Sequence, residues 1–364
     1  MRLASLQIYR YALRLATPLV LKSGVINSRQ GLLLKFTDDK GNVGFGEVAP
    51  LPGLSRESLE EVMGELQQIS KSILKQKINQ TLLDFDGKFQ SWLRSNPLSP
   101  STHFGIEMGL TNLLAAAHRL QLSELFSSRI SAKVQVNALL NYDTTDIKAA
   151  VKKLLNEGYQ TIKLKVGQGK LQQDVRRVQE LREAGGEKIS LRLDANQAWS
   201  LSEAVRFGNQ VRDFKIEYIE EPLQDPSVLG SFYQECGVPV ALDESLSTLE
   251  FNHFDWDFPI KAIVLKQMVL GSLVKIIPLI QKADSAGIYP VFSSAFESGL
   301  TLSFLVQLAA VFSPPGVAMG LDTYKWLGED LLKTPFRVKQ GWVGVKKVVE
   351  KANYIDFSKL KLIF

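Results

Sequence analysis

The chain has 364 residues, of which 45% are hydrophobic and 22% charged, a composition typical of a globular protein that can bury a large core. Its formal net charge of +5 comes from scattered lysines and arginines, which argues against a nucleic-acid-binding surface and leaves a weak attraction for anionic small molecules. One cysteine and three histidines exclude an intrachain disulfide and multi-cysteine zinc sites, and they indicate a reducing compartment.

The apolar segments of the chain are short. None approaches the roughly 20 apolar residues of a membrane span, and the N-terminal segment is interrupted by Arg2, Arg10 and Arg14. We therefore expect a cytoplasmic protein with no membrane span and no nucleic-acid partner.

Residues 1–97 are expected to form a small α+β domain. The apolar segments GLLLKF and VGFGEV flank the turn-like DDKGN and predict a β-hairpin. After Pro52-Gly53 the apolar residues recur at helical spacing, and Ser55 is the predicted N-cap of this helix. The proline- and serine-rich stretch 95–100 is the predicted linker to the next domain.

Residues 98–321 are expected to form a barrel of alternating strands and helices. Eight strand-like segments are separated by gaps with a helical pattern, which predicts successive βα units. An open doubly wound sheet is the alternative, but no GxGxxG turn follows an early strand to favour it. The tail 322–364 has a hairpin pattern in FRVKQGWVGVKK and is expected to pack on the first domain. The predicted strands begin near Val134, Thr161, Ser190, Ile216, Val238, Ala262, Tyr289 and Val317.

Acidic residues stand where three consecutive strands end. Asp194, Glu220 and Asp243 end the segments SLRLD, IEYIE and PVALD. Neighbouring strands lie about 4.8 Å apart, so the carboxylates can meet at the C-terminal mouth of the barrel, where a hard cation such as Mg²⁺ suits them. Asn196 and Glu244 follow two of these acids as predicted supporting partners. Taken singly, each acid is equally well explained as the N-cap of the next helix.

Lysines end two further strands, TIKLK and AIVLK. Lys163 and Lys165 share one face of their strand, and their like charges and partial burial are expected to lower a lysine pKa toward that of a usable base. Lys266 is expected on the opposite side of the mouth. A base, a metal ion and a second cation on the far face are the parts that formation of a carbanion beside a carboxylate requires.

At these residues the chain resembles the enolase superfamily, specifically the muconate-lactonising-enzyme subgroup, with KxK on the second barrel strand and a lysine on the sixth. The segments APLPGLSRESLEE, YIEEPL, ALDES, VLKQMVLGS and SSAFESGL resemble o-succinylbenzoate synthases. The resemblance covers nearly the whole chain. It implies a (β/α)7β TIM-like barrel, with an α+β capping domain built from residues 1–97 and completed by 322–364.

The resemblance also implies a reaction, the Mg²⁺-dependent syn-dehydration of 2-succinyl-6-hydroxy-2,4-cyclohexadiene-1-carboxylate to 2-succinylbenzoate in menaquinone or phylloquinone synthesis. In such a carbon–oxygen lyase, Lys165 removes the proton α to the substrate carboxylate, and Lys163 tunes that base. Lys266 stabilises charge from the opposite face. The implied ligands of Mg²⁺, for which Mn²⁺ is a substitute, are Asp194, Glu220 and Asp243.

Substrate selection is predicted to lie at the end of the seventh strand and in the capping loops. Each residue there is equally well explained as an ordinary turn or cap residue. The predicted substrate-binding residues are Ser293, Ser294, Ser23, Gly24 and Leu51.

Three alternatives remain open. Dipeptide epimerases share the lysines and carboxylates, but they typically carry Asp-x-Asp at the end of the eighth strand, where this chain has Asp322 followed two places on by Tyr324. An N-acylamino acid racemase would use the same lysine pair on both faces of its substrate. A catalytically silent barrel that acts as a scaffold is the alternative of another class, and buried like-charged lysines without a role argue against it.

Overall fold

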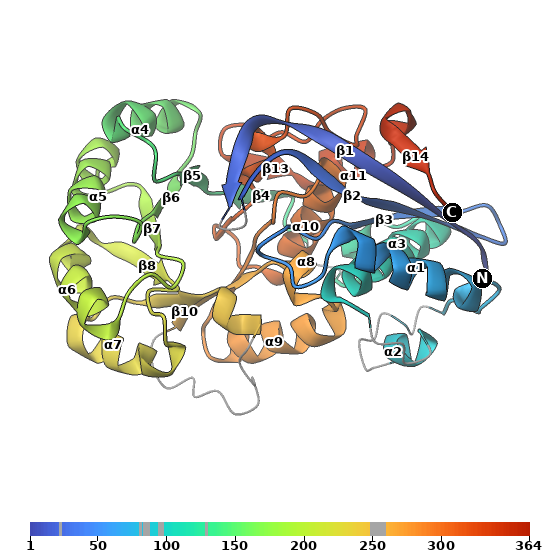
Figure 1. Ribbon diagram of the computed structural model, residues 1–364, viewed down its shortest axis with the longest axis horizontal. Coiled ribbons are helices and arrows are strands. Elements are labelled where there is room, and N and C mark those ends of the chain that lie inside the picture. The colour runs from blue at the N-terminus through green and yellow to red at the C-terminus, as the bar shows by residue number, and fades with distance from the viewer. Residues whose placement is uncertain (22–23, 80–81, 83–87, 94–97, 128–129, 248–259) are drawn as a thin grey trace.

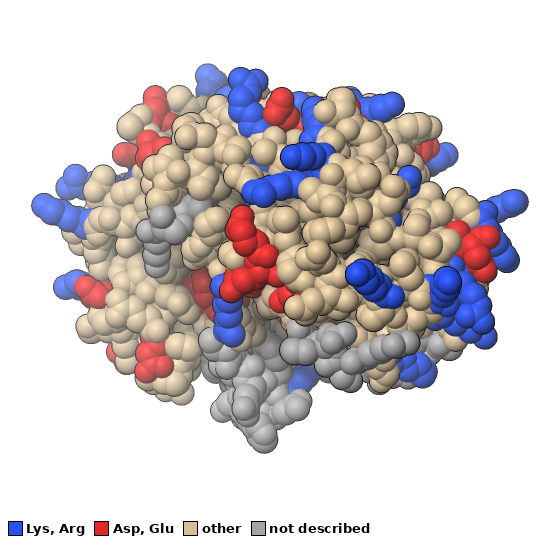
Figure 2. Space-filling model, turned by 45° about the vertical axis from the view of Figure 1, so that its right-hand side comes forward, with Lys and Arg blue, Asp and Glu red and all other residues tan. Residues whose placement is uncertain are grey.

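The computed structural model describes residues 1–21, 24–79, 82, 88–93, 98–127, 130–247 and 260–364. Figure 1 shows an antiparallel sheet with its helices on one side of the molecule and a curved parallel sheet surrounded by helices on the other. Lysine and arginine side chains are spread over the face seen in Figure 2 instead of forming one patch. No helix among the described residues is long and apolar enough to cross a membrane.

The antiparallel sheet contains both ends of the chain. Alternate residues of its second strand, Leu32, Leu34 and Phe36, are fully buried against helices. Leu33, on the other face of the strand, is also fully buried, in the apolar cluster that includes the barrel core. The predicted hairpin is confirmed. The strand order is β14-β1-β2-β3, with β1 (Leu3–Leu21), β2 (Gly24–Asp38), β3 (Val43–Val48) and β14 (Leu360–Leu362). The accompanying helices are α1 (Leu59–Ile73), α2 (Lys88–Trp92) and α3 (Pro100–His118).

The N-cap of α1 is Ser58, so the prediction of Ser55 is wrong. Ser58 and Glu61 form a capping box, in which each side chain accepts a hydrogen bond from the backbone N–H of the other. The Ser55 hydroxyl instead accepts a hydrogen bond from Leu51 N at 2.9 Å. Ser55 therefore stabilises the loop before the helix.

The parallel sheet forms a closed barrel, as predicted. The eight predicted strand starts lie at or within two residues of observed ones. The strands are β4 (Lys133–Val136), β5 (Ala138–Leu140), β6 (Thr161–Lys165), β7 (Ser190–Asp194), β8 (Ile216–Glu220), β9 (Val240–Leu242), β10 (Ile260–Leu265), β11 (Tyr289–Phe292) and β12 (Ala318–Met319). The helices are α4 (Ile147–Asn156), α5 (Leu171–Gly185), α6 (Leu201–Val211), α7 (Leu229–Cys236), α8 (Gln267–Leu270), α9 (Leu273–Ser285) and α10 (Gly299–Phe312).

The last barrel strand joins the two ends of the parallel sheet. β12 pairs in parallel with β4, and the residue after it, Gly320, forms a bridge to Ser293 at the end of β11. Gly320 N donates to Phe292 O at 2.9 Å, and Asn137 N donates to Met319 O at 3.0 Å. These contacts close the parallel sheet within the described residues, so the alternative of an open doubly wound sheet is wrong.

The C-terminal tail contributes to both sheets. The hairpin predicted in FRVKQGWVGVKK is present as a single antiparallel bridge between Lys339 and Trp342 around a two-residue turn. β13 (Trp342–Gly344) then pairs antiparallel with β4, and α11 (Val345–Ala352) follows it. Val345 and Val348 are buried at helical spacing, which favours a helix over a continuation of β13. β14 then returns to β1. The division into 1–97 with 322–364 and 98–321 stays a prediction.

Glu47 of β3 connects the antiparallel sheet to the barrel. Its carboxylate is fully buried and accepts hydrogen bonds from Ser298 N at 3.0 Å, Ser298 Oγ at 2.6 Å and Thr301 Oγ1 at 2.7 Å, at the start of α10. Tyr11 OH donates to it at 2.5 Å. A carboxylate is favourable there because the helix N-terminus carries free N–H groups and a partial positive charge. Glu47 thus fixes the antiparallel sheet against the barrel.

Glu107→Gln is expected to remove part of the pH dependence of stability. Burial raises the pKa of Glu107 to about 7 from an ordinary 4.5, against hydrogen bonds from Ser272 and Leu273 at the start of α9. The folded chain therefore holds this proton more tightly than the unfolded chain. The contribution of Glu107 to the free energy of unfolding then falls as pH rises from 4.5 to 7, by up to about 3 kcal/mol.

Urea unfolding of the wild type and the variant near these two pH values measures this difference. Glu60→Gln, a change at a side chain that is 74% exposed, is the control. If the free energy of unfolding of Glu107→Gln changed with pH as much as that of the wild type, the prediction would be contradicted.

Candidate active site

The strand-end lysines and acids of the sequence meet at the C-terminal mouth of the barrel. The register pairs Lys165 of β6 with Asp194 of β7, and Asp194 with Glu220 of β8. Asp243 follows β9 and Lys266 follows β10. Because parallel strands end on the same side of a sheet, this register places the side chains around one opening.

Lys163 and Lys165 form ion pairs with the acids of the two next strands. Lys163 Nζ lies 2.7 Å from Asp194 Oδ2 and 2.7 Å from both carboxylate oxygens of Glu220. Lys165 Nζ lies 2.7 Å from Asp194 Oδ2 and 2.6 Å from Asn196 Oδ1. The Asp194 and Glu220 side chains are 1% exposed, so these charges interact with little screening by water.

The predicted lowering of a lysine pKa does not hold for Lys163. Burial alone would lower the pKa of Lys163, but the carboxylates of Asp194 and Glu220 outweigh it and raise that pKa. Burial raises the pKa of Asp194, but the ammonium groups of Lys163 and Lys165 outweigh it and lower that pKa. The strand pattern shows two like charges side by side, whereas the opposite charges come from neighbouring strands.

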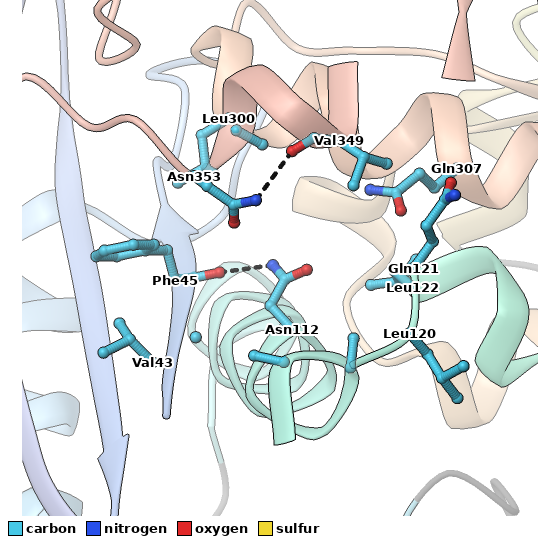
Figure 3. Close-up of a pocket in the computed structure, with 14 residues that line it drawn as sticks. Val43, Phe45, Asn112, Leu120, Gln121, Leu122, Leu300, Gln307, Val349 and Asn353 are labelled. Atoms are coloured by element: carbon cyan, nitrogen blue, oxygen red, sulfur yellow. Dashed lines mark hydrogen bonds between the residues drawn. The ribbon is translucent and has the colours of Figure 1, made fainter. Parts of the chain in front are cut away.

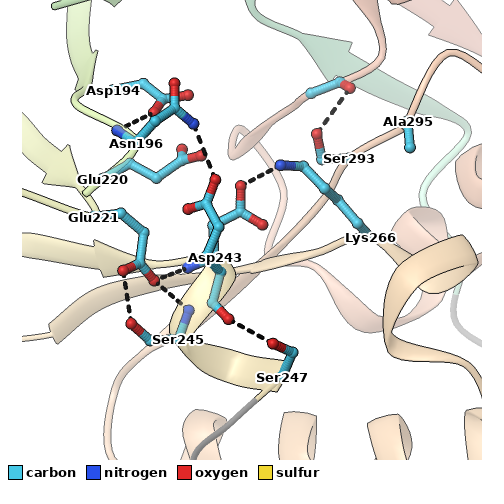
Figure 4. A network of polar contacts seen from close by, with 12 residues as sticks. Asp194, Asn196, Glu220, Glu221, Asp243, Ser245, Ser247, Lys266, Ser293 and Ala295 are labelled. Carbon is cyan, nitrogen blue, oxygen red and sulfur yellow. Dashed lines mark hydrogen bonds and ion pairs between the residues drawn. The ribbon is translucent and has the colours of Figure 1, made fainter. Parts of the chain in front are cut away.

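Lys266 and Asp243 form a second ion pair (Figure 4). In the strand order, β7 and β8 lie between this pair and β6. Burial lowers the pKa of Lys266, but Asp243 and Glu244 outweigh it and raise that pKa. Lys266 is therefore an ammonium group at neutral pH. It supplies a fixed positive charge to the mouth.

Asn196 and Glu244, the predicted supporting partners, contact each other. Asn196 Nδ2 donates to Glu244 Oε1 at 3.0 Å, while its Oδ1 accepts from Lys165 (Figure 4). Because an amide has its donor and acceptor on different atoms, these two bonds fix the orientation of Asn196. A short polar chain therefore connects Lys165 to the loop after β9.

The acids at the mouth offer carboxylate oxygens, the type of donor atom that divalent cations such as Mg²⁺ prefer. These oxygens belong to Asp194, Glu220 and Asp243. Lysine ammonium groups lie between or beside the three carboxylates. Glu244 Oε2 is buried without a hydrogen-bond partner beside Asp243. Among the described residues no three histidine, cysteine or acidic side chains are gathered closely enough to enclose a metal ion. Lysine ammonium groups separate these acids.

The predicted substrate-binding residues do not share one environment. The Ser293 hydroxyl donates to Gly320 O at 3.2 Å and lies near Lys266 in Figure 4, whereas the Ser294 hydroxyl is buried against Thr323. Leu51 packs with other apolar residues in a cluster over the barrel. Gly24 lies in the β1–β2 hairpin with φ of +128°, a value that favours glycine. Ser23 lies outside the described residues.

Two cavities in the described part of the chain lie away from this mouth. One, of about 150 Å³, is bordered by β3, α3, α10 and α11 (Figure 3). Asn112 and Asn353 line it and donate to the carbonyl oxygens of Phe45 and Val349. The other, of about 380 Å³, is lined by residues at the starts of α3 and α9. No carboxylate or amine lines the first cavity, so it offers no acid–base chemistry.

Comparisons with known proteins match most of this chain. The family description "Enolase C-terminal domain-like" matches residues 146–348, and "MenC, N-terminal domain" matches residues 1–113. The structure of a dipeptide epimerase from Enterococcus faecalis, complexed with Mg and L-Leu-L-Tyr, superposes with a TM-score of 0.82. It is 21% identical in sequence and covers 95% of this chain and 97% of its own. That likeness supports the fold.

Sequence relatives are more specific. The o-succinylbenzoate synthase of Pasteurella multocida is 30% identical over 327 residues, covering 87% of this chain and 88% of the relative. Protein PHYLLO of Arabidopsis thaliana, a chloroplastic protein, is 35% identical over 84% of this chain, which spans only 20% of PHYLLO. The chain therefore belongs to the o-succinylbenzoate synthase family of the enolase superfamily.

Proposed function

We propose that this chain dehydrates 2-succinyl-6-hydroxy-2,4-cyclohexadiene-1-carboxylate to 2-succinylbenzoate, a step of menaquinone or phylloquinone synthesis. The observation that carries the proposal is the ring of strand-end charges, in which Lys163 and Lys165 face Lys266 across three carboxylates. Family membership supports the choice of substrate. The single cysteine, Cys236, is a buried free thiol, and this supports a cytoplasmic location.

Lys165 is the proposed base. Its side chain is 22% exposed, against 12% for Lys163, so Lys165 is the amine of the pair that a substrate in the mouth reaches more easily. Neutral Lys165 takes the proton α to the substrate carboxylate and becomes an ammonium, which Asp194 and Asn196 stabilise. The C–O bond then breaks, and Lys165 returns its proton to the departing hydroxyl, which leaves as water. Both transfers use one face of the ring, so the elimination is syn.

The negative charge that forms on the substrate has two proposed sources of stabilisation. Asp194, Glu220 and Asp243 would hold Mg²⁺, which supplies Lewis-acid stabilisation of the substrate carboxylate. Lys266 supplies positive charge from the other side, and its raised pKa keeps it charged at neutral pH. Lys163, whose pKa Asp194 and Glu220 raise, is also an ammonium and adds positive charge beside Lys165.

A second candidate is a dipeptide epimerase or N-acylamino acid racemase, because a lysine stands on each side of the mouth. The end of the eighth strand argues against a dipeptide. Asp322 is buried, accepts from Tyr159 OH at 2.6 Å and pairs with Lys325 at 3.1 Å, so its carboxylate is already neutralised. Tyr324 replaces the second acid.

Turnover of the cyclohexadiene carboxylate tests the proposal. Purified protein with Mg²⁺ is expected to remove the substrate's ultraviolet absorbance rapidly, and chelation should stop the reaction. Added Mn²⁺ should restore activity in part. No turnover by folded, Mg²⁺-bound protein would overturn the proposal, and racemisation of N-acylamino acids and dipeptides would then be assayed.

A further inference from the structure

Glu221, the second acid of YIEEPL, is buried at the mouth of the barrel and accepts four hydrogen bonds. Figure 4 shows those from Asp243 and Ser245. One oxygen, Oε1, accepts from Asp243 N at 2.7 Å and from Ser245 N at 2.8 Å. The other, Oε2, accepts from Ser245 Oγ at 2.6 Å and from Gln197 Nε2 at 3.1 Å. An ionised carboxylate has about four acceptor positions, so Glu221 has none left for a ligand.

These four bonds connect three loops. Gln197 follows β7, Glu221 follows β8, and Asp243 and Ser245 follow β9. Each of these loops lies next to one of the three acids proposed to hold the cation. One buried carboxylate therefore fixes the spacing of all three strand ends.

The backbone at this point is strained. Glu221 has φ of +43°, and Asn196 and Gln197 have φ of +45° and +59°. All three values lie in the left-handed region, which residues other than glycine rarely adopt. Such conformations cost on the order of 1–3 kcal/mol each and persist only where surrounding contacts hold them. Two backbone hydrogen bonds help to hold these conformations, from Gln197 N to Glu221 O at 2.7 Å and from Glu221 N to Ala241 O at 3.0 Å.

We propose that Glu221 is a positioning residue that fixes the three strand ends carrying Asp194, Glu220 and Asp243, the proposed ligands of a divalent cation. This inference rests on the proposed function only in taking these three acids as the ligands. Mutation of a residue that orients metal ligands through hydrogen bonds typically lowers metal affinity by about 10- to 100-fold. We expect a loss of this order when the Glu221 carboxylate is removed.

Glu221→Gln tests the proposal with little change of shape. It replaces one oxygen by an NH₂ group, so a donor then faces the backbone N–H groups or Gln197. The dissociation constant for Mg²⁺, measured by calorimetry without substrate, is expected to rise by about 10-fold or more. Hydrogen exchange at Asp243 and Ser245, followed by mass spectrometry without metal, should become faster.

Glu217→Gln is the matched control. Glu217 lies on the same strand and pairs with Arg192 at 2.9 Å, near the opposite end of the barrel. This control should lose stability but keep the wild-type affinity for Mg²⁺. If Glu221→Gln fails to fold, Ser245→Ala removes one of the four bonds and should weaken Mg²⁺ binding in the same direction.

Wild-type Mg²⁺ affinity in folded Glu221→Gln, or the same loss in Glu217→Gln, would overturn the positioning role. So would a wild type that does not bind Mg²⁺. A wild type that binds Mg²⁺ but does not turn over the cyclohexadiene carboxylate would overturn only the proposed function. The role of Glu221 is decided by the Mg²⁺ dissociation constant of Glu221→Gln relative to that of the wild type, which needs no turnover.

Discussion

Lys165→Ala is expected to lower kcat for the dehydration by on the order of 10²- to 10⁴-fold, the usual contribution of a positioned acid–base group. The variant removes the proposed base, whereas Asp194 keeps its ion pair with Lys163. The fold should therefore be retained. Loss of substrate absorbance measures kcat, and circular dichroism and thermal unfolding check the fold.

Lys261→Ala is the control for loss of a lysine. Lys261 is exposed near the start of β10, at the end of that strand away from the mouth. It should keep wild-type kcat. Full dehydratase activity in Lys165→Ala would show that another group is the base, and a scaffold protein would likewise keep its function in this variant.

Asp194→Asn is expected to abolish turnover and to lower the free energy of unfolding at neutral pH by about 3 kcal/mol, the lower end of the effect of breaking a buried ion pair. Asp194 Oδ2 lies 2.7 Å from both Lys163 Nζ and Lys165 Nζ. An amide removes the charge that both ammonium groups share, while Glu220 still pairs with Lys163. Mg²⁺ affinity should fall as well, because a proposed ligand is lost.

Urea unfolding, calorimetry with Mg²⁺ and the absorbance assay measure these three effects of Asp194→Asn. Asp213→Asn, at a side chain that is 93% exposed, is the control and should change none of them. Wild-type turnover and Mg²⁺ affinity in Asp194→Asn would remove Asp194 from the proposed ligands.

The barrel and the placement of its charged mouth were predictable from the sequence because they depend on short-range patterns. Alternation within a strand puts Lys163 and Lys165 on one face, and the end of a strand is visible where its apolar run stops. Parallel packing then places Asp194 beside Lys165 without further information. The same argument brings Lys266 and Asp243 to the mouth.

Only the tertiary structure decided which partner each charge has. Lys163 has a raised pKa because carboxylates on β7 and β8 surround it, and no local pattern shows that balance. Glu47 contacts Ser298, 251 residues away, and Glu221 contacts Ser245 across a strand. The tail residue Trp342 pairs with Gln135 of β4, a partner far earlier in the chain. Hydrogen-bond partners depend on register and closure, whereas periodicity records only which face of each element is buried.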